Sequence, residues 1–293
     1  MTQSSFVSGS RYVVVSPVKD EELYIERTIQ SMLMQTVRPV QWLIVDDGST
    51  DQTPAIIAKY TRDHEWIKSI RIDRDSVRNL GVTEIRAFAT GYESIRGLPH
   101  EYVVKMDCDL ELPADYFERL IREMVADPKL GVVSGLYLEN STGEWRPVKM
   151  PTYHAAGATK VVRLQCFRDI DGFVLDRGWD TIDEIRAQFK GWKTRHFDDI
   201  QFNHLKPEGS KAGSLSTCRF HGEIYYLTGG GLFFFLFKSM HRAISGSPFL
   251  IGGLAMFYGF LKASLSGKKR LVSDDESRFY QRMLNRRILK PLF

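Results

Sequence analysis

The sequence predicts an α/β fold in which helices cover both faces of a mainly parallel β-sheet. Short apolar runs alternate with amphipathic segments over the first two-thirds of the chain, as strands and helices alternate in such folds. Acidic clusters follow two of the apolar runs, and parallel sheets place ligand-binding residues after the carboxyl ends of their strands. The 293 residues suffice for one large domain or for a domain with an appendage.

The first strand and helix are predicted at residues 11–16 and 24–35. The strand is apolar and ends before Pro17, while the helix carries apolar side chains at helical spacing. A second strand at 40–45 ends at the acidic pair Asp46 and Asp47. A helix at 54–62 and a strand at 67–72 follow it. The same alternation continues with a helix at 82–95 and a strand at 102–106, which ends at Asp107.

The next part of the chain is predicted to close the sheet. We expect a helix at 114–125, a strand at 130–138 and a strand with a turn within 157–173. Residues 140–153 are polar and contain glycine and proline, which indicates a loop or hairpin. A helix at 181–190 ends at Gly191, a typical C-terminal cap, and a strand follows at 192–197.

The chain changes character after His204. Residues 225–237 and 249–265 are apolar and contain glycine, and 276–293 has an Arg-rich helical pattern. The second apolar run is too short for a membrane-spanning helix, which needs roughly twenty residues. We therefore expect two domains, a catalytic domain at 1–222 and a helical, basic and aromatic extension at 223–293.

The positive charge is concentrated in the tail. The net charge is +4, but residues 232–293 carry eleven Lys or Arg and three acids, hence +8, which leaves −4 for the remainder. Four phenylalanines within residues 233–237 precede Lys238 and His241, a pattern typical of a segment at an anionic membrane surface. The alternatives are a solvated helical face and helices that pack on the catalytic body.

The cysteines and the first residues indicate the compartment. Three cysteines do not suggest a disulfide framework and fit a reducing environment. Residues 1–5 lack the basic and apolar regions of a signal peptide. We expect a cytoplasmic protein with a peripheral contact at the inner face of the plasma membrane, and no nucleic-acid partner.

Asp107 and Asp109 form the most informative pair in the chain. Side chains two positions apart on a strand point to the same face, so both carboxylates can hold one hard cation. Mg²⁺ or Mn²⁺ accepts such ligands and shares its other positions with water and phosphate oxygens. The alternative is a strand end followed by a solvated acidic turn. Cys108 between them is expected to be a packing residue.

Three motifs in order resemble the family 2 glycosyltransferases over residues 11–205. The family's opening resembles Ser16-Pro17-Val18-Lys19-Asp20-Glu21 and Leu43-Ile44-Val45-Asp46-Asp47-Gly48-Ser49-Thr50-Asp51. Its metal-binding segment resembles Asp107-Cys108-Asp109 with Pro113, and its catalytic-base segment resembles Trp179-Asp180-Thr181-Ile182-Asp183-Glu184 with Gly191. The resemblance implies a GT-A fold, a nucleotide-sugar donor and inversion at the anomeric carbon.

The resemblance also implies roles for the acidic residues. Asp107 and Asp109 would hold Mg²⁺ or Mn²⁺ against the donor's diphosphate, with His204 as a further metal ligand or else a structural histidine. Alignment on Gly191 makes Asp180 the general base, in preference to Asp183. The family often has Asn near position 19 or 20 and Glu-Asp before the last helix, and this chain departs from both. No Gln-x-x-Arg-Trp segment follows, which disfavours a polymerising synthase.

The nucleotide is expected to meet Pro17, Asp46, Asp47, Arg86 and Asp107. A carboxylate at a strand end can accept the imino N–H of uracil or guanine, and the family favours UDP. The alternative for the acidic pair is a turn with an Asx cap on the next helix, and both roles can coexist. Arg86 would touch the diphosphate or, alternatively, be a solvated helix residue.

The sequence therefore predicts an inverting, metal-dependent glycosyltransferase. Its acceptor is expected to be a glycan of the cell surface or a lipid-linked precursor. One alternative is a sugar-phosphate nucleotidyltransferase, although residues 16–20 lack a glycine-rich phosphate loop. The other is a non-catalytic nucleotide-sugar-binding module, which should have lost an acid at 107, 109 or 180, and none is missing.

Overall fold

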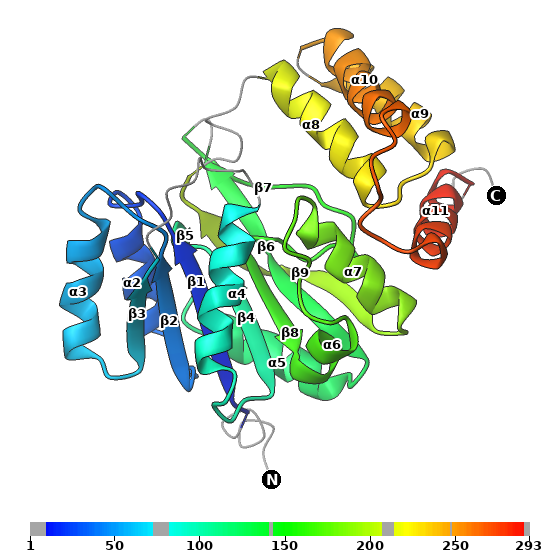
Figure 1. Cartoon of the computed structure of the whole chain (residues 1–293). Coiled ribbons are helices and arrows are strands. Elements are labelled where there is room, and N and C mark those ends of the chain that lie inside the picture. Colours follow the sequence, from blue (N-terminus) through cyan, green and yellow to red (C-terminus); the bar gives the residue numbers. More distant parts are fainter. Residues whose placement is uncertain (1–9, 73–81, 141–142, 207–213, 247, 290–293) are drawn as a thin grey trace. The chain divides into compact units, whose positions relative to one another are not determined.

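A computed structural model describes residues 10–72, 82–140, 143–206, 214–246 and 248–289 (Figure 1). They form two compact units. The first comprises the described residues of Met1–Asp176 and Lys190–Pro207, and the second comprises those of Arg177–Phe189 and Glu208–Phe293. The segment without signal-peptide features, 1–5, and the last four residues of the helix expected at 276–293 lie outside the described residues.

A single mixed sheet forms the centre of the first unit. Its strands are β1 Tyr12–Val18, β2 Gln41–Asp46, β3 Ile67–Arg71, β4 Tyr102–Met106, β5 Leu110–Glu111, β6 Leu130–Asn140, β7 Trp145–Pro147, β8 Thr159–Arg163 and β9 Lys193–His204. Their order is β3-β2-β1-β4-β8-β6-β9-β5, with β7 paired to β6. The predicted α/β class is confirmed.

The order of the strands reverses beside β1. The chain runs from β1 to β2 to β3 on one side and then returns to β4 on the other, and all these pairs are parallel. Open α/β sheets bind ligands outside the carboxyl ends of the strands at such a point. Beyond β4 the sheet is mixed, because β8 is antiparallel to both of its neighbours whereas β6 and β9 are parallel.

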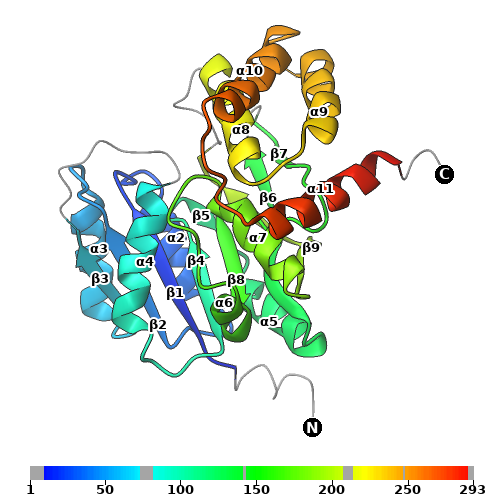
Figure 2. The same ribbon diagram turned by 45° about the vertical axis from the view of Figure 1, so that its right-hand side comes forward.

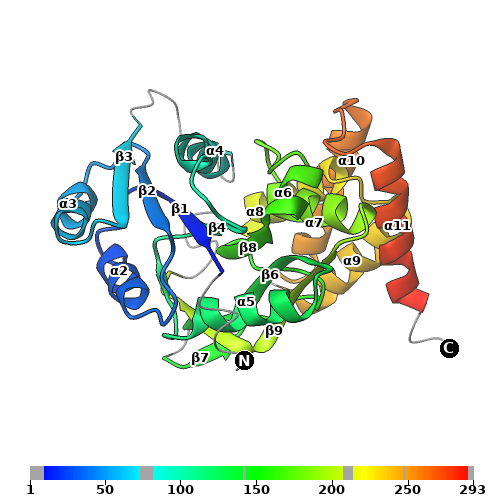
Figure 3. The ribbon, with the colours of Figure 1, turned by 90° about the horizontal axis from the view of Figure 1, so that it is seen from below.

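Helices cover both faces of this sheet. They are α2 Ile25–Leu33, α3 Thr53–Asp63, α4 Thr83–Ile95, α5 Tyr116–Ala126 and α6 Leu164–Asp169. Figure 3 shows α4 on one face of β1 and β2 and α2 on the other. Gly91 lets α4 lie close to these strands, because a Cβ there would stand 2.5 Å from Val45 and 2.8 Å from Val15. The continuous core includes Tyr12, Ile44 and Phe117.

The second unit is helical and has its own core. Its helices are α7 Trp179–Phe189, α8 Ser214–Leu227, α9 Leu232–Ser245, α10 Ile251–Leu265 and α11 Asp274–Leu289. The core joins Ile185 of α7 to Tyr225, Phe235, Phe260 and Leu284. Glycines let α8 and α10 cross closely, since Gly222 faces the carbonyl of Met256 and Gly259 faces that of Arg219.

The expected boundary after residue 222 lies inside α8, and α7 groups with the C-terminal helices. The assignment of separate functions to the two parts stays a prediction. The apolar run 225–237 is not one element, because Gly229, Gly230 and Gly231 separate α8 from α9. Within the described part of the chain, none of the helices combines the length and the apolar character needed to cross a membrane.

Candidate active site

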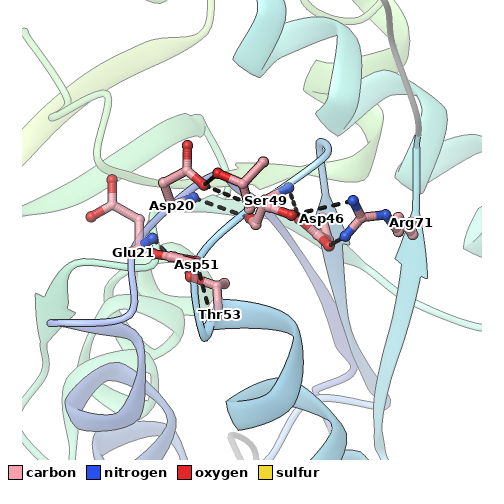
Figure 4. Close-up of polar contacts among 8 residues, drawn as sticks. Asp20, Glu21, Asp46, Ser49, Asp51, Thr53 and Arg71 are labelled. Atoms are coloured by element: carbon pink, nitrogen blue, oxygen red, sulfur yellow. Dashed lines mark hydrogen bonds and ion pairs between the residues drawn. The ribbon is translucent and has the colours of Figure 1, made fainter.

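Two loops at the carboxyl ends of β1 and β2 are fixed to each other by hydrogen bonds (Figure 4). The Asp20 N–H donates to Ser49 Oγ at 3.1 Å, and Asp20 Oδ1 accepts from the Thr50 N–H at 2.8 Å. The Glu21 N–H donates to Thr53 Oγ1 at 2.9 Å. Asp20 adopts a positive φ of 54°, which aspartate tolerates better than most residues. These hydrogen bonds therefore join the two loops into one wall.

Asp46 and Asp47 occupy different environments in this wall. Asp46 Oδ1 accepts from the Ser49 N–H at 2.8 Å, and its Oδ2 pairs with Arg71 Nη1 at 2.7 Å. Its carboxylate thus holds the turn between β2 and α3. Asp47 is buried next to it, and its N–H donates to the Val18 carbonyl at 2.9 Å.

Asp51, rather than either member of the pair, accepts from the N–H of Thr53, the first residue of α3, at 2.9 Å. This bond lies beside the N-cap residue of α3, Gln52, whose own side chain makes no capping hydrogen bond. Asp46 is engaged in the turn, and the nucleotide-reading role of the pair stays a prediction.

Asp107 is held by a buried lysine. Lys105 lies inside β4, and its Nζ donates to Asp107 Oδ1 at 2.5 Å and to the Gly157 carbonyl at 2.9 Å. The same ammonium contacts Glu84 of α4. Burial lowers the pKa of Lys105, but the two carboxylates outweigh it, so the net direction is upward. Burial raises the pKa of Asp107, Lys105 opposes this, and Glu84 and Asp109 add to it.

Asp109 is buried, and one of its oxygens accepts no hydrogen bond from the described residues. Among the described residues, none donates to Asp109 Oδ1. Asp109 Oδ2 lies 3.5 Å from His204 Nε2. The pairing of β5 with β9 causes this proximity, because it sets Leu110 opposite His204, and the Leu205 N–H donates to the Asp109 carbonyl at 2.8 Å.

His204 lies between two carboxylates. Its Nδ1 is 3.5 Å from Glu139 Oε1, since the parallel pairing of β6 with β9 places Glu139 beside it. The ring of Tyr137 meets the imidazole edge-on, with ring centroids 5.7 Å apart. The structure thus brings Asp109 and His204 together, two of the three residues predicted to bind a metal.

These residues fit a divalent cation that takes few protein ligands. No metal-holding group of three or more His, Cys, Asp or Glu side chains occurs within the part of the chain that the structure describes. Mg²⁺ in nucleotide enzymes usually needs only one or two carboxylates, because phosphate and water oxygens supply the rest. A buried carboxylate oxygen without a hydrogen bond costs free energy that a bound cation would recover. Asp109 meets this description, whereas Asp107 already engages Lys105.

The remaining predicted residues lie in three places. Pro17 is buried in β1 opposite Val45, and Arg86 is exposed on α4. Asp180 is partly exposed in the first turn of α7, in the second unit, where its charge acts on nearby His221. The alternative base, Asp183, is buried in the same helix. Its Oδ1 accepts a hydrogen bond from the Glu184 N–H at 2.7 Å.

Cys108 is buried, in agreement with its expected packing role. Burial raises the pKa of its thiol well above the ordinary value, and Asp107, Asp109 and Glu21 add to the effect.

Sequence reasoning missed Lys105, Arg71 and Glu139. Lys105 stands two positions before Asp107 on the same strand face, and a lone charge in an apolar run is a signal for a buried ion pair. Arg71 ends the strand beside β2, in register with Asp46. Nothing in the sequence around Glu139 indicates a role in the site, because only the pairing of β6 with β9 brings this residue to His204.

Comparisons with known proteins agree on one family. The profile of glycosyl transferase family 2 matches residues 13–192, more than half of the chain. Among curated proteins, the chain is 26% identical over 117 residues to a poly-beta-1,6-N-acetyl-D-glucosamine synthase of Staphylococcus epidermidis. It is 32% identical over 110 residues to a chondroitin synthase of Escherichia coli. These matches span 40% and 38% of this chain, and 26% and 15% of the respective relatives, so the chain corresponds to a minor part of their length.

Two solved structures show the same fold. A mannosyltransferase of Pyrobaculum calidifontis, in complex with GDP-Man and Mn²⁺, aligns with a TM-score of 0.56 and 18% identity over 98% of this chain and 82% of its own. S. aureus TarS 1-349, in complex with UDP-GlcNAc, aligns with a TM-score of 0.56 and 18% identity over 88% and 73%.

Proposed function

The chain belongs to glycosyl transferase family 2, and on this premise we propose that it is a metal-dependent, inverting glycosyltransferase. It transfers a sugar from a nucleotide diphosphate sugar to a hydroxyl group of an acceptor. The observation that carries the proposal is the buried Asp109 carboxylate after β4, at the switch point of the sheet. One of its oxygens lacks a hydrogen bond from any described residue, and the other lies 3.5 Å from His204.

Asp109, His204 and Asp107 would hold Mg²⁺ or Mn²⁺. The ion would supply Lewis-acid stabilisation of the departing diphosphate. The mannosyltransferase with the same fold was solved with Mn²⁺ and GDP-Man, which supports the choice of metal. Lys105 would keep the Asp107 carboxylate aimed, because it ties that side chain to Gly157 and Glu84.

The nucleotide would lie against the wall formed by the β1 and β2 loops. Asp46 holds the turn through Ser49 and Arg71, so we assign the base-reading role to Asp47. Its carboxylate would accept the imino N–H of uracil or guanine. Pro17 would shape the wall at the end of β1, and Arg86 on α4 would contact the diphosphate.

Asp180 would be the general base. It takes the proton from the acceptor hydroxyl as this oxygen attacks the anomeric carbon, with an expected contribution of about 10²–10⁴ to the rate. A base must be reachable by the acceptor, and Asp180 is partly exposed whereas Asp183 is buried. Attack opposite the leaving diphosphate inverts the anomeric carbon.

UDP is the favoured nucleotide, and GDP is the competing one because guanine also has an imino N–H. The acceptor would be a cell-surface glycan or a lipid-linked precursor, reached from the cytoplasmic face of the plasma membrane. The absence of a Gln-x-x-Arg-Trp segment from the sequence favours transfer of single sugars over polymerisation.

The test is release of nucleoside diphosphate from a panel of UDP-sugars and GDP-sugars, with Mn²⁺ and with a chelator. We expect release from one donor class, dependent on the metal, and lost in Asp109→Asn. Asp63→Asn removes an exposed carboxylate on α3 and should leave release unchanged. Pyrophosphate release from a nucleoside triphosphate and a sugar phosphate would instead establish a nucleotidyltransferase and overturn the proposal.

A further inference from the structure

Helix α9 exposes a row of large apolar side chains. Phe233, Phe237, Met240 and Ile244 are 47–69% exposed, and their spacing of three and four residues places them on one helix face. On another face, Phe235 and Ser239 are buried in the unit. The exposed row is therefore a second apolar face, and the packing of the unit does not account for it.

Helix α10 repeats this arrangement. Ile251, Leu254 and Tyr258 are 53–68% exposed on one face, while Met256 and Phe260 are buried. Of nineteen large apolar side chains that are exposed among the described residues, twelve lie between 232 and 265. Such a concentration marks an interaction surface rather than scattered exposure.

The two rows lie on adjoining helices (Figure 2). Gly253 of α10 faces Ser239 and Ala243 of α9, and the Leu250 N–H donates to the Ala243 carbonyl at 2.8 Å. The α9–α10 surface is defined here by Phe233, Phe237, Met240, Ile244, Leu254 and Tyr258. Each helix buries one face in protein and exposes another, which is the arrangement of helices that lie in the plane of a membrane interface.

The charge of this region indicates what covers the surface. Residues 232–270 contain six Lys or Arg and no Asp or Glu. Lys262 continues the exposed row of α10 one turn after Tyr258, and Lys269 is exposed soon after the helix ends. A second copy of the chain would bring like charges together, whereas anionic lipid headgroups attract them. Long lysine stems can also lie along apolar surface while the ammonium stays in water.

We propose that the α9–α10 surface docks flat on an anionic lipid bilayer, with its apolar side chains among the acyl chains and its basic side chains at the headgroups. This deepens the proposed function and rests on it in one respect, that the acceptor is carried in the membrane. Docking would confine the enzyme to the surface where such an acceptor is found.

Co-sedimentation of the full chain with vesicles tests the proposal. We expect binding to phosphatidylcholine vesicles that contain about one third phosphatidylglycerol, and binding weaker by about tenfold or more to pure phosphatidylcholine. Folding of every variant is checked by circular dichroism and thermal melting. Equal binding to both vesicle types, or none to either by the folded wild type, would overturn the proposal.

Matched variants locate the surface. Phe237→Ser with Leu254→Ser should weaken binding about tenfold or more, because both side chains lose their burial in lipid. Leu23→Ser with Met34→Ser removes apolar side chains of the first unit that are even more exposed, and it should have no effect. Lys262→Glu with Lys269→Glu should weaken binding, and Lys68→Glu with Lys129→Glu should not. Equal effects of test and control pairs would contradict the proposal, as would a wild-type dimer that Phe237→Ser with Leu254→Ser dissociates.

The two proposals fail separately. Vesicle binding by a folded protein that releases nucleoside diphosphate from no donor leaves the docking intact and removes the proposed function. Metal-dependent release of nucleoside diphosphate by a protein that does not bind vesicles would contradict the docking proposal and support the proposed function.

Discussion

Lys105 shows how one residue organises the acidic end of β4. It is buried, yet its ammonium serves Asp107, Glu84 and the Gly157 carbonyl, which come from three different parts of the first unit. Leaving the buried ammonium without these three acceptors would cost free energy, and so would leaving the carboxylates without the ammonium. The position of Asp107 therefore depends on a residue that would not itself touch the substrate.

Lys105→Met should destabilise the protein by about 1–3 kcal/mol, because it leaves two partly exposed carboxylates without their counter-ion. Urea unfolding measures the change. Lys129→Met, an exposed position, should shift the free energy of unfolding by no more than about 0.5 kcal/mol. A Lys105→Met protein as stable as the wild type would show that the ion pairs contribute little.

Asp180 and Asp183 stand three residues apart and should respond differently to substitution. Asp180→Asn should lower kcat by about 10²–10⁴ without changing the Kd for the nucleotide, since a base acts in the chemical step. Asp183→Asn alters a buried carboxylate that accepts from the Glu184 N–H, so it should lower the melting temperature. Full activity in Asp180→Asn, with loss in a stably folded Asp183→Asn, would transfer the role to Asp183.

At the scale of elements, the approach of α4 to the sheet is set by one glycine. Gly91→Ala should destabilise the protein by about 1–3 kcal/mol, because the added methyl group would overlap Val45 and Val15. Gly97→Ala is the matched control, since a Cβ at Gly97 meets nothing within 4 Å. Chemical denaturation of both variants decides the question. Equal midpoints would mean that α4 can move away from the strands without cost.

The strands that carry the predicted acids were predictable because their signals are local. β1, β2 and β4 are largely apolar runs, and both acidic clusters stand at the ends of such runs. Residues 198–204 of β9 were missed although residues 200–204 alternate apolar and polar side chains as a half-buried strand does. They follow a register shift opposite Gly135 and Leu136, which the sequence does not reveal. β5 has two residues, too few for any periodicity. These two strands bring His204 to Asp109, so that contact was accessible only through tertiary pairing.

The antiparallel direction of β8 could not be predicted from its own residues either. Its apolar residues predict a strand, but nothing in 159–163 fixes its direction between β4 and β6. The exposed face of α9 could likewise not be predicted from the sequence. The sequence predicted an apolar, basic tail, but helical spacing alone does not tell which apolar face a neighbour covers, and the structure shows Phe235 buried and Phe233 exposed.

At the scale of the whole molecule, charge separates the tail from the body. The last 62 residues carry +8 and the rest carries −4. An electrostatic contribution to docking should therefore weaken with salt, because the Debye length falls from about 10 Å at 0.1 M to about 3 Å at 1 M. We expect vesicle binding to fall severalfold over this range, measured by co-sedimentation. Binding that does not change with salt would mean that the apolar rows alone attract the protein to the vesicle, which would contradict the role given to the lysines.

The central claim is that Asp109 joins a divalent cation to the donor's diphosphate. Calorimetric titration of UDP into the protein, with and without Mn²⁺, tests it most directly, with GDP as the second nucleotide. In the wild type, Mn²⁺ should tighten binding of the preferred nucleotide by about tenfold or more, and in a folded Asp109→Asn variant this metal effect should vanish. An equal Mn²⁺ effect in Asp109→Asn, or nucleotide binding that Mn²⁺ does not change in the wild type, would contradict the account.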